Sequence, residues 1–245
     1  LLLAFFGGCL IVFVLGRLVA RQLFALDGVG QSVFALGGIF SNNVLLGLPL
    51  ARVALGDDAI PSVALVLVFN ALILWTLVSV SVEWAQHGSF SVRGFTKTAY
   101  GVLTNPIVAG ILSGTLFGLS GLPLPPLVAL PLGMVGQAAA PLALLALGMG
   151  LAEHGVRNGW RISVAISIVK LIVRPRVVWL LARLIGLPAM ETRVVVLLAS
   201  LAVGANVYLM SRQFKTLEGP VASSLVLTTA LAALTTPLAL TLSGA

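Results

Sequence analysis

The sequence predicts an all-α polytopic membrane protein, and its composition is the first reason. Of its 245 residues, 59% are apolar and 9% are charged, with a mean hydropathy of +1.14. An ordinary soluble domain is about 45–50% apolar and about 25% charged. At roughly 20 apolar residues per span, there is material for about eight helices and too little polar sequence for a second, water-soluble domain. We therefore exclude a soluble enzyme and predict a function inside the membrane.

Apolar runs separated by turn-forming or charged residues place the helices. The first three runs end at Asp27-Gly28, at Gly56-Asp57-Asp58 and at the polar stretch 84–102. The later runs are separated by prolines between 123 and 131 and by the polar stretches 153–159, 186–188 and 215–220. The predicted helices cover about 2–23, 28–52, 60–83, 103–120, 132–152, 161–185, 194–212 and 220–243.

The basic residues predict an orientation, because Lys and Arg concentrate in cytoplasmic loops. If the predicted helices cross the membrane in alternating directions, one side of the membrane carries Arg17, Arg21, Arg93, Lys97, Arg157, Arg161, Arg212 and Lys215. The other side carries Arg52, Arg183 and Arg193. The C-terminus is then outside, and the connection 84–102 is cytoplasmic. The net charge of +7 is scattered between apolar runs without a basic patch, so we predict no nucleic-acid partner. The expected location is the plasma membrane, in bacteria the inner membrane.

Two of the runs are poor continuous helices. Residues 28–52 contain glycines, a serine and two asparagines at mid-depth, which a simple lipid-facing span would avoid. Residues 194–212 contain Ala202-Val203-Gly204-Ala205-Asn206. The two share a short pattern, Asn43-Val44-Leu45 and Asn206-Val207-Tyr208. We predict that both helices are broken.

This pairing predicts inverted repeats. The first three runs match the sixth to eighth. By the charge count, the two members of each matched pair enter the membrane from opposite faces. Transporters with inverted repeats have this arrangement and build their substrate site from discontinuous helices. Residues 1–83 would be the remainder of a first repeat, 84–102 a cytoplasmic linker and 103–245 a second repeat. Because three runs precede the linker and five follow it, we expect two helices to be missing in front of Leu1.

The breaks are the candidate substrate site. A broken helix exposes backbone N–H and C=O groups, and the positive end of a half-helix favours an anion. The candidate binding residues are Asn43, Gly47, Pro49, Gly204 and Asn206. The alternative is that these polar residues only hold helices together.

Basic residues inside the sixth run add to this site. At 1.5 Å per residue, Lys170 lies about 13 Å into the membrane from Arg161, and intramembrane cations are usually functional. Lys170 and Arg174 share a helix face, and all seven acidic residues fall at run ends or in loops. An anionic substrate or an acid in the missing helices is the expected partner. The alternative is a shifted helix in which Arg174 and Arg176 reach a water-filled crevice for structural reasons.

Other residues carry weaker signals. Gln137, which interrupts the fifth run, is a further candidate at the site, and Asn70 is a lone polar group that fits an interhelical bond or a ligand contact equally well. Cys9 is the single cysteine, and His87 and His154 lie in polar stretches without further ligands. No nucleotide or hydrolase motif is present. We therefore predict no catalytic residue, metal or cofactor.

Three segments together resemble the auxin efflux carrier family, and most closely its bacterial branch of malonate and other organic-acid permeases. They are Ser41–Leu50, Asn105-Pro106 and Gly136–Ala152. The resemblance implies ten helices in two inverted five-helix repeats, with broken fourth and ninth helices that cross at Asn43–Pro49 and Gly204–Asn206. It puts Asn43, Pro49 and Asn206 at the substrate and Lys170 near it. The family often has a proline at the second crossover, where this chain has Ala202-Val203-Gly204.

The predicted function is secondary active transport of a small organic anion, such as malonate or a related carboxylate, by alternating access. One alternative is a sodium-coupled bile-acid-type symporter of related fold. Another is a non-transporting membrane sensor or assembly subunit. The sequence leaves open the substrate, the direction of transport, whether H⁺ or Na⁺ is the coupling ion, and whether the chain forms a homodimer in the bilayer.

Overall fold

The chain is a helical membrane protein in its computed structural model. The structure describes residues 1–87, 100, 106–154 and 159–243. Within these ranges it contains helices and a single isolated β-bridge. The helices are α1 (Leu2–Phe24), α2 (Gly28–Ile39), η1 (Asn43–Gly47), α3 (Leu48–Leu55), η2 (Asp57–Ala59), α4 (Ile60–His87), α6 (Pro106–Leu119), α7 (Pro126–His154), α8 (Trp160–Ile168), η3 (Val169–Val173), α9 (Arg174–Ile185), α10 (Ala189–Ser200), α11 (Ala205–Gln213) and α12 (Glu218–Leu242).

Every run predicted as a span forms helix over most of its described residues, and two of the runs are interrupted. Three helices are long and apolar enough to cross a bilayer by themselves, at Leu2–Phe24, Asp57–Gln86 and Glu218–Leu242. The second run is divided into α2 and α3, and the seventh into α10 and α11. The prediction of a helical, multi-pass membrane protein is therefore confirmed.

Two capping interactions fix the connection between α1 and α2. Helix α1 ends at Ala25, which adopts the left-handed conformation and donates its N–H to Ala20 O. Asp27 then caps α2, because its carboxylate accepts the N–H of Gly30 at 2.9 Å. The short connection makes α1 and α2 antiparallel neighbours. Gly16 of α1 lies so close to α2 that a Cβ there would be 3.0 Å from Ala35 Cα.

Two π-helical turns have the same cause. Each precedes a proline, η1 before Pro49 and η3 before Pro175. A proline has no N–H, and its ring collides with the carbonyl of the residue four positions earlier. That residue lies within the π turn in both cases, at Leu45 and Leu171. The wider π turn accommodates the ring without breaking the helix, so the sixth run continues through Pro175.

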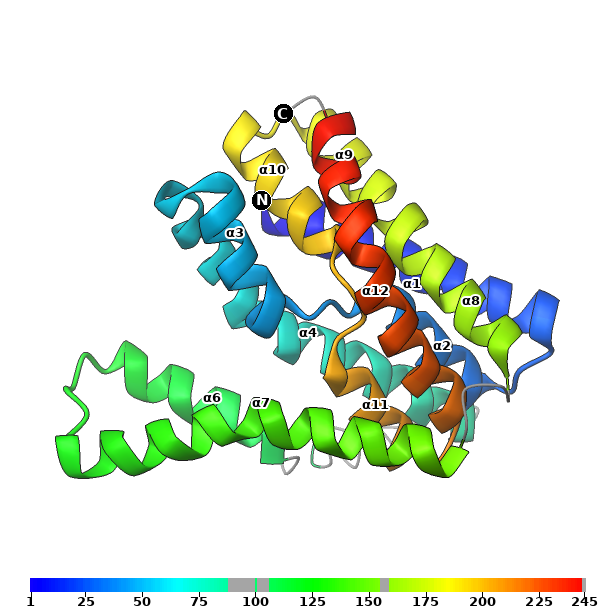
Figure 1. Ribbon diagram of the computed structural model, residues 1–245, viewed down its shortest axis with the longest axis horizontal. Helices are drawn as coiled ribbons and strands as arrows, with labels where there is room; N and C mark the ends of the chain where they lie inside the picture. The colour runs from blue at the N-terminus through cyan, green and yellow to red at the C-terminus, as the bar shows by residue number, and fades with distance from the viewer. Residues whose placement is uncertain (88–99, 101–105, 155–158, 244–245) are drawn as a thin grey trace.

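The bundle is assembled around α10. Helix α1 packs against α2 and α9, and α12 packs against α8 and α10. Helix α6 packs against α4, and α7 contacts α11 and α12 along one edge of the molecule (Figure 1). The two connections inside the broken helices pass each other in the middle of the bundle (Figure 1).

Candidate functional site

The two broken helices cross through extended backbone. Phe40–Asn42 joins α2 to η1, and Leu201–Gly204 joins α10 to α11. Ser41 and Val203 form an antiparallel bridge. Asn42 donates its N–H to Ala202 O at 3.0 Å, and Gly204 donates its N–H to Phe40 O at 3.0 Å. Each segment thus satisfies backbone groups that the other segment exposes.

Both breaks lie a few residues before the predicted crossovers. We expected the first at Asn43–Pro49, but the extended backbone is Phe40–Asn42 and the later residues are helical. We expected the second at Gly204–Asn206, but the helix is interrupted from Leu201 to Gly204. At the first break, Pro49 produces a π turn and does not interrupt the helix. At both breaks, the extended residues are the ones held by hydrogen bonds between the two segments.

Gly204 makes the close crossing possible. A Cβ at Gly204 would lie 2.9 Å from Phe40 Cδ1 and 3.0 Å from the carbonyl oxygen of Ser41. Its backbone angles, φ −80° and ψ 145°, are open to any residue. Glycine is required here by the approach of the other chain segment. No proline occupies this segment, and the extended bridge supplies the break instead.

The end of α10 at the crossover is fully capped. A helix leaves its last four carbonyls without backbone partners, and here each has a side-chain donor. Leu197 O accepts from Ser200 Oγ at 2.8 Å, Leu198 O from Ser41 Oγ at 2.6 Å, Ala199 O from Lys170 Nζ at 3.0 Å, and Ser200 O from Thr236 Oγ1 at 3.0 Å. Helices α8–α9, α12 and the first crossover segment therefore all hold this end of α10.

Thr228 of α12 satisfies the second crossover segment, because its hydroxyl accepts the N–H of Val203 at 3.1 Å. We expect Thr228→Val to leave this buried N–H unpaired at a cost of about 1–3 kcal/mol and to lower the melting temperature of the detergent-purified full-length protein. Thr229→Val is the matched control, since the Thr229 hydroxyl bonds to Leu225 O one turn back in the same helix. Equal melting temperatures for the two variants would contradict this role.

Lys170 and Arg174 converge on Ser41. Both side chains are completely buried. Lys170 Nζ donates to Ser41 Oγ at 2.7 Å, and Arg174 Nη1 donates to the same oxygen. The Ser41 hydroxyl in turn donates to Leu198 O, so its hydrogen-bonding capacity is used in full. Two cations thus face the C-terminal, negative end of the half-helix α10.

The remaining contacts of Arg174 come from α1. Its Nη2 lies 3.5 Å from Cys9 Sγ, and its Cζ lies 4.9 Å from the centroid of the Phe5 ring. Its Nε is buried without a partner. Arg176, in contrast, is exposed. Arg174 therefore does not share a water-filled crevice with Arg176, because the two side chains leave the helix in different directions.

Within the described residues neither cation has a carboxylate partner. The ion pairs recorded there join Arg52 with Asp57 and Arg212 with Glu218. The same part of the chain contains no group of three His, Cys, Asp or Glu residues that could hold a metal ion. Both cations are shielded from any ligand in this conformation, so a substrate would touch them only after the crossover segments move.

Two asparagine amides meet beside the crossover. Asn43, at 2% exposure, donates its Nδ2 to Asn70 Oδ1 of α4 at 3.2 Å. Its own Oδ1 is buried without a hydrogen-bond partner, and such an atom is costly unless a ligand or water satisfies it. Asn206, in the first turn of α11, is half-buried. The pairing of Asn43 with Asn70 was not predicted, because these residues come from different helices.

The structure brings most of the candidate residues together. Gly47 is buried against α10, where a Cβ would lie 2.9 Å from Leu198 Cδ2. Pro49 is exposed on α3, although its effect on the π turn places Asn43. Gln137 stays apart, exposed on α7. Ser41, Thr228 and Thr236 were missed as individual residues, and the only signal for Ser41 was its place beside two asparagines in an apolar run.

A comparison with known protein families decides the class. A model described as membrane transport protein matches residues 1–240. The chain belongs to this family. The resemblance to auxin efflux carriers is thereby confirmed, and the chain is a membrane transporter by family.

Two curated relatives agree with this class. An uncharacterized transporter of Methanocaldococcus jannaschii is 24% identical over 226 residues, which cover 90% of this chain and 71% of the relative. A protein of Rhizobium meliloti named "Putative malonate transporter" is 28% identical over 234 residues, which cover 92% of this chain and 70% of the relative.

Proposed function

We propose that this chain is the core of a secondary active transporter for small organic anions, such as malonate or related carboxylates. The observation that carries the proposal is the pair of buried cations, Lys170 and Arg174, at the crossover without a carboxylate partner among the described residues. Buried intramembrane cations are expensive and tend to serve the transported charge. Their positive potential favours an anion over a neutral or cationic substrate.

The polar groups nearest the break supply the contacts. We assign Asn43, Asn70 and Asn206 as hydrogen-bonding groups, with the N–H groups of Ala205 and Asn206 at the start of α11 as further donors. Gly47 and Gly204 allow the close packing, and Pro49 sets the turn that carries Asn43. Lys170 and Arg174 act through their charge while the site is closed and contact the carboxylate when the segments separate. Gln137, remote on α7, would join only through a movement of that helix.

The proposed mechanism is alternating access in an inverted-repeat fold. The interrupted helices α2–α3 and α10–α11 support it, because they are broken at corresponding places and lie antiparallel at the bridge. In this proposal residues 1–83 and 103–245 belong to two five-helix repeats joined by a cytoplasmic linker at 84–102. The C-terminus lies on the outer, non-cytoplasmic side of the inner membrane. The proposed transporter uses H⁺ or Na⁺ as its coupling ion and needs no bound cofactor. A homodimer is the proposed assembly.

Uptake of radiolabelled malonate by proteoliposomes of the full-length protein tests the site. We expect Asn43→Ala and Asn206→Ala each to reduce uptake about tenfold or more, since the loss of a hydrogen bond to a charged group costs about 1.5–3 kcal/mol. Gln213→Ala, an exposed change at the far end of α11, is the control and should retain uptake. Normal uptake by both asparagine variants would remove the site assignment.

The alternatives have their own readouts in the same vesicles. Uptake that requires a sodium gradient and accepts a bile acid would favour the bile-acid-type symporter. Binding of an organic acid without any flux would favour a sensor or assembly subunit. Malonate flux driven by an imposed pH gradient in sodium-free buffer supports proton coupling.

A further inference from the structure

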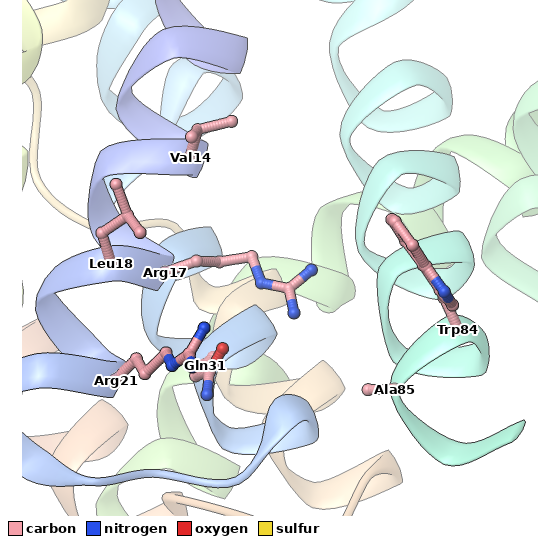
Figure 2. A pocket seen from close by; sticks show the side chains of 7 residues that line it. All are labelled: Val14, Arg17, Leu18, Arg21, Gln31, Trp84 and Ala85. Carbon is pink, nitrogen blue, oxygen red and sulfur yellow. The ribbon is translucent and has the colours of Figure 1, made fainter. Parts of the chain in front are cut away.

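A pocket separate from the crossover opens between α1, α2 and α4. Its volume is about 400 Å³. Figure 2 shows Arg17 reaching from α1 toward the helix that carries Trp84, with Arg21 and Gln31 close to each other below it. The lining residues are Val14, Arg17, Leu18, Arg21, Gln31, Trp84 and Ala85. None of them belongs to the proposed substrate site.

The wall of this pocket changes from apolar to basic along α1. Val14 and Leu18 are 51% and 45% exposed, and Arg21 lies in the last turn of the helix. With a rise of 1.5 Å per residue, Val14 lies about 10 Å deeper than Arg21 along the helix axis. The pocket therefore offers an apolar surface toward the middle of the membrane and positive charge at its boundary, which matches a molecule with an anionic head and a hydrocarbon tail.

Arg17 is held in place for such a head. Its Nη1 donates to Ser81 Oγ at 2.8 Å, and Ser81 Oγ lies 2.8 Å from Ser32 Oγ, whose hydroxyl bonds to Gly28 O. This chain of hydroxyl groups ties α1, α2 and α4 together behind the guanidinium. The other guanidinium nitrogens of Arg17 have no recorded partner within the described residues and remain free to donate. A guanidinium binds phosphate through two parallel hydrogen bonds.

The surroundings fit the boundary of a membrane. Trp84, 54% exposed, lies in the last turn of α4, and tryptophan is enriched at the level of lipid headgroups. The seven lining residues include two arginines and no acidic residue. The charge count predicts that this end of the bundle is cytoplasmic, where the leaflet is rich in anionic lipid.

We propose that this pocket binds an anionic phospholipid of the surrounding leaflet. Arg17 and Arg21 bind the phosphodiester, Trp84 packs beside the glycerol region, and an acyl chain lies along Val14 and Leu18. The bound lipid fills the gap between α1 and α4.

Native mass spectrometry of the detergent-solubilised full-length protein tests this site. We expect phosphatidylglycerol to remain bound at collision energies that remove phosphatidylcholine. The double variant Arg17→Gln/Arg21→Gln should weaken phosphatidylglycerol binding about tenfold or more, because each basic residue near an anionic headgroup adds to the electrostatic attraction. The control is Arg161→Gln/Lys215→Gln, which removes two cations assigned to the same end of the bundle but outside the pocket, and it should bind like the wild type. Equal retention of both lipids, or equal weakening in both double variants, would overturn the proposal.

A photo-cross-linking experiment identifies the molecule bound in the pocket. A photoreactive substitution, Leu18→p-benzoylphenylalanine, should attach phosphatidylglycerol when the full-length protein is irradiated in vesicles. Attachment to another protein segment in place of lipid would overturn the proposal. Displacement of the lipid by millimolar inorganic phosphate would also overturn it, since the free anion would then be the ligand.

Discussion

Gly204→Ala is expected to abolish transport and to destabilise the bundle. Its new methyl group would lie 3.0 Å from Ser41 O and 3.2 Å from Ser41 C, which are backbone atoms that cannot rotate away. The two extended segments would have to separate, and the hydrogen bond from Gly204 N–H to Phe40 O would be lost. Overpacking of this kind typically costs about 1–3 kcal/mol. The measurements are malonate uptake and the melting temperature of the purified protein.

Gly136→Ala provides the matched control, because nothing lies within 4 Å of a Cβ at that position in α7. Alanine is also the better helix former by roughly 1 kcal/mol, so this variant should be at least as stable as the wild type. If Gly204→Ala retained normal uptake and stability, the close crossing of the two segments would have no functional importance.

Lys170→Met should lower the affinity for malonate far more than it lowers the amount of folded protein. Methionine fills a similar apolar volume without the charge. An elementary charge about 8 Å from an anion contributes roughly 2 kcal/mol at an effective dielectric constant of about 20, or about thirtyfold in affinity. The change also leaves Ala199 O without its cationic donor. We expect KM to rise by about this factor in proteoliposomes.

Two further variants separate charge from packing. Lys215→Met removes an exposed lysine from the connection after α11 and should leave KM unchanged. Lys170→Arg keeps the positive charge and should recover part of the affinity that Lys170→Met loses. A Lys170→Met protein with normal KM and reduced yield would show that Lys170 is only a structural cap for α10.

The helices were predictable because the membrane imposes a simple pattern on the sequence. A span needs about 20 apolar residues, and the polar punctuation at Asp27-Gly28 and Gly186 marks helix ends that the structure confirms. The interruption of the second and seventh runs was also predictable, because glycine and asparagine at mid-depth are unfavourable in a lipid-facing helix. The exact extended residues were not, since they depend on pairing between Ser41 and Val203.

The contacts of the site were less predictable than its elements. Lys170 and Arg174 stood out from their depth, but Ser41, their common partner, lies 129 and 133 positions away in sequence. The Asn43–Asn70 bond likewise depends on how α4 packs against the crossover. Arg17 and Arg21 contributed to the orientation count alone, and only the arrangement of α1, α2 and α4 shows that they line a pocket. One-dimensional patterns specify depth and periodicity, whereas these contacts require the tertiary packing.

The most direct test of the central claim, that an organic anion binds at the crossover, is substrate protection of a cysteine placed there. Ala205→Cys puts a thiol in the first turn of α11, beside the bridge, in a protein whose single cysteine is removed by Cys9→Ser. We predict that malonate slows its labelling by a small thiol reagent, that neutral malonamide does not, and that Gln213→Cys at the other end of α11 is labelled at the same rate with or without malonate. Labelling of Ala205→Cys that is indifferent to malonate, or slowed equally by malonamide, would contradict an anion site at the crossover.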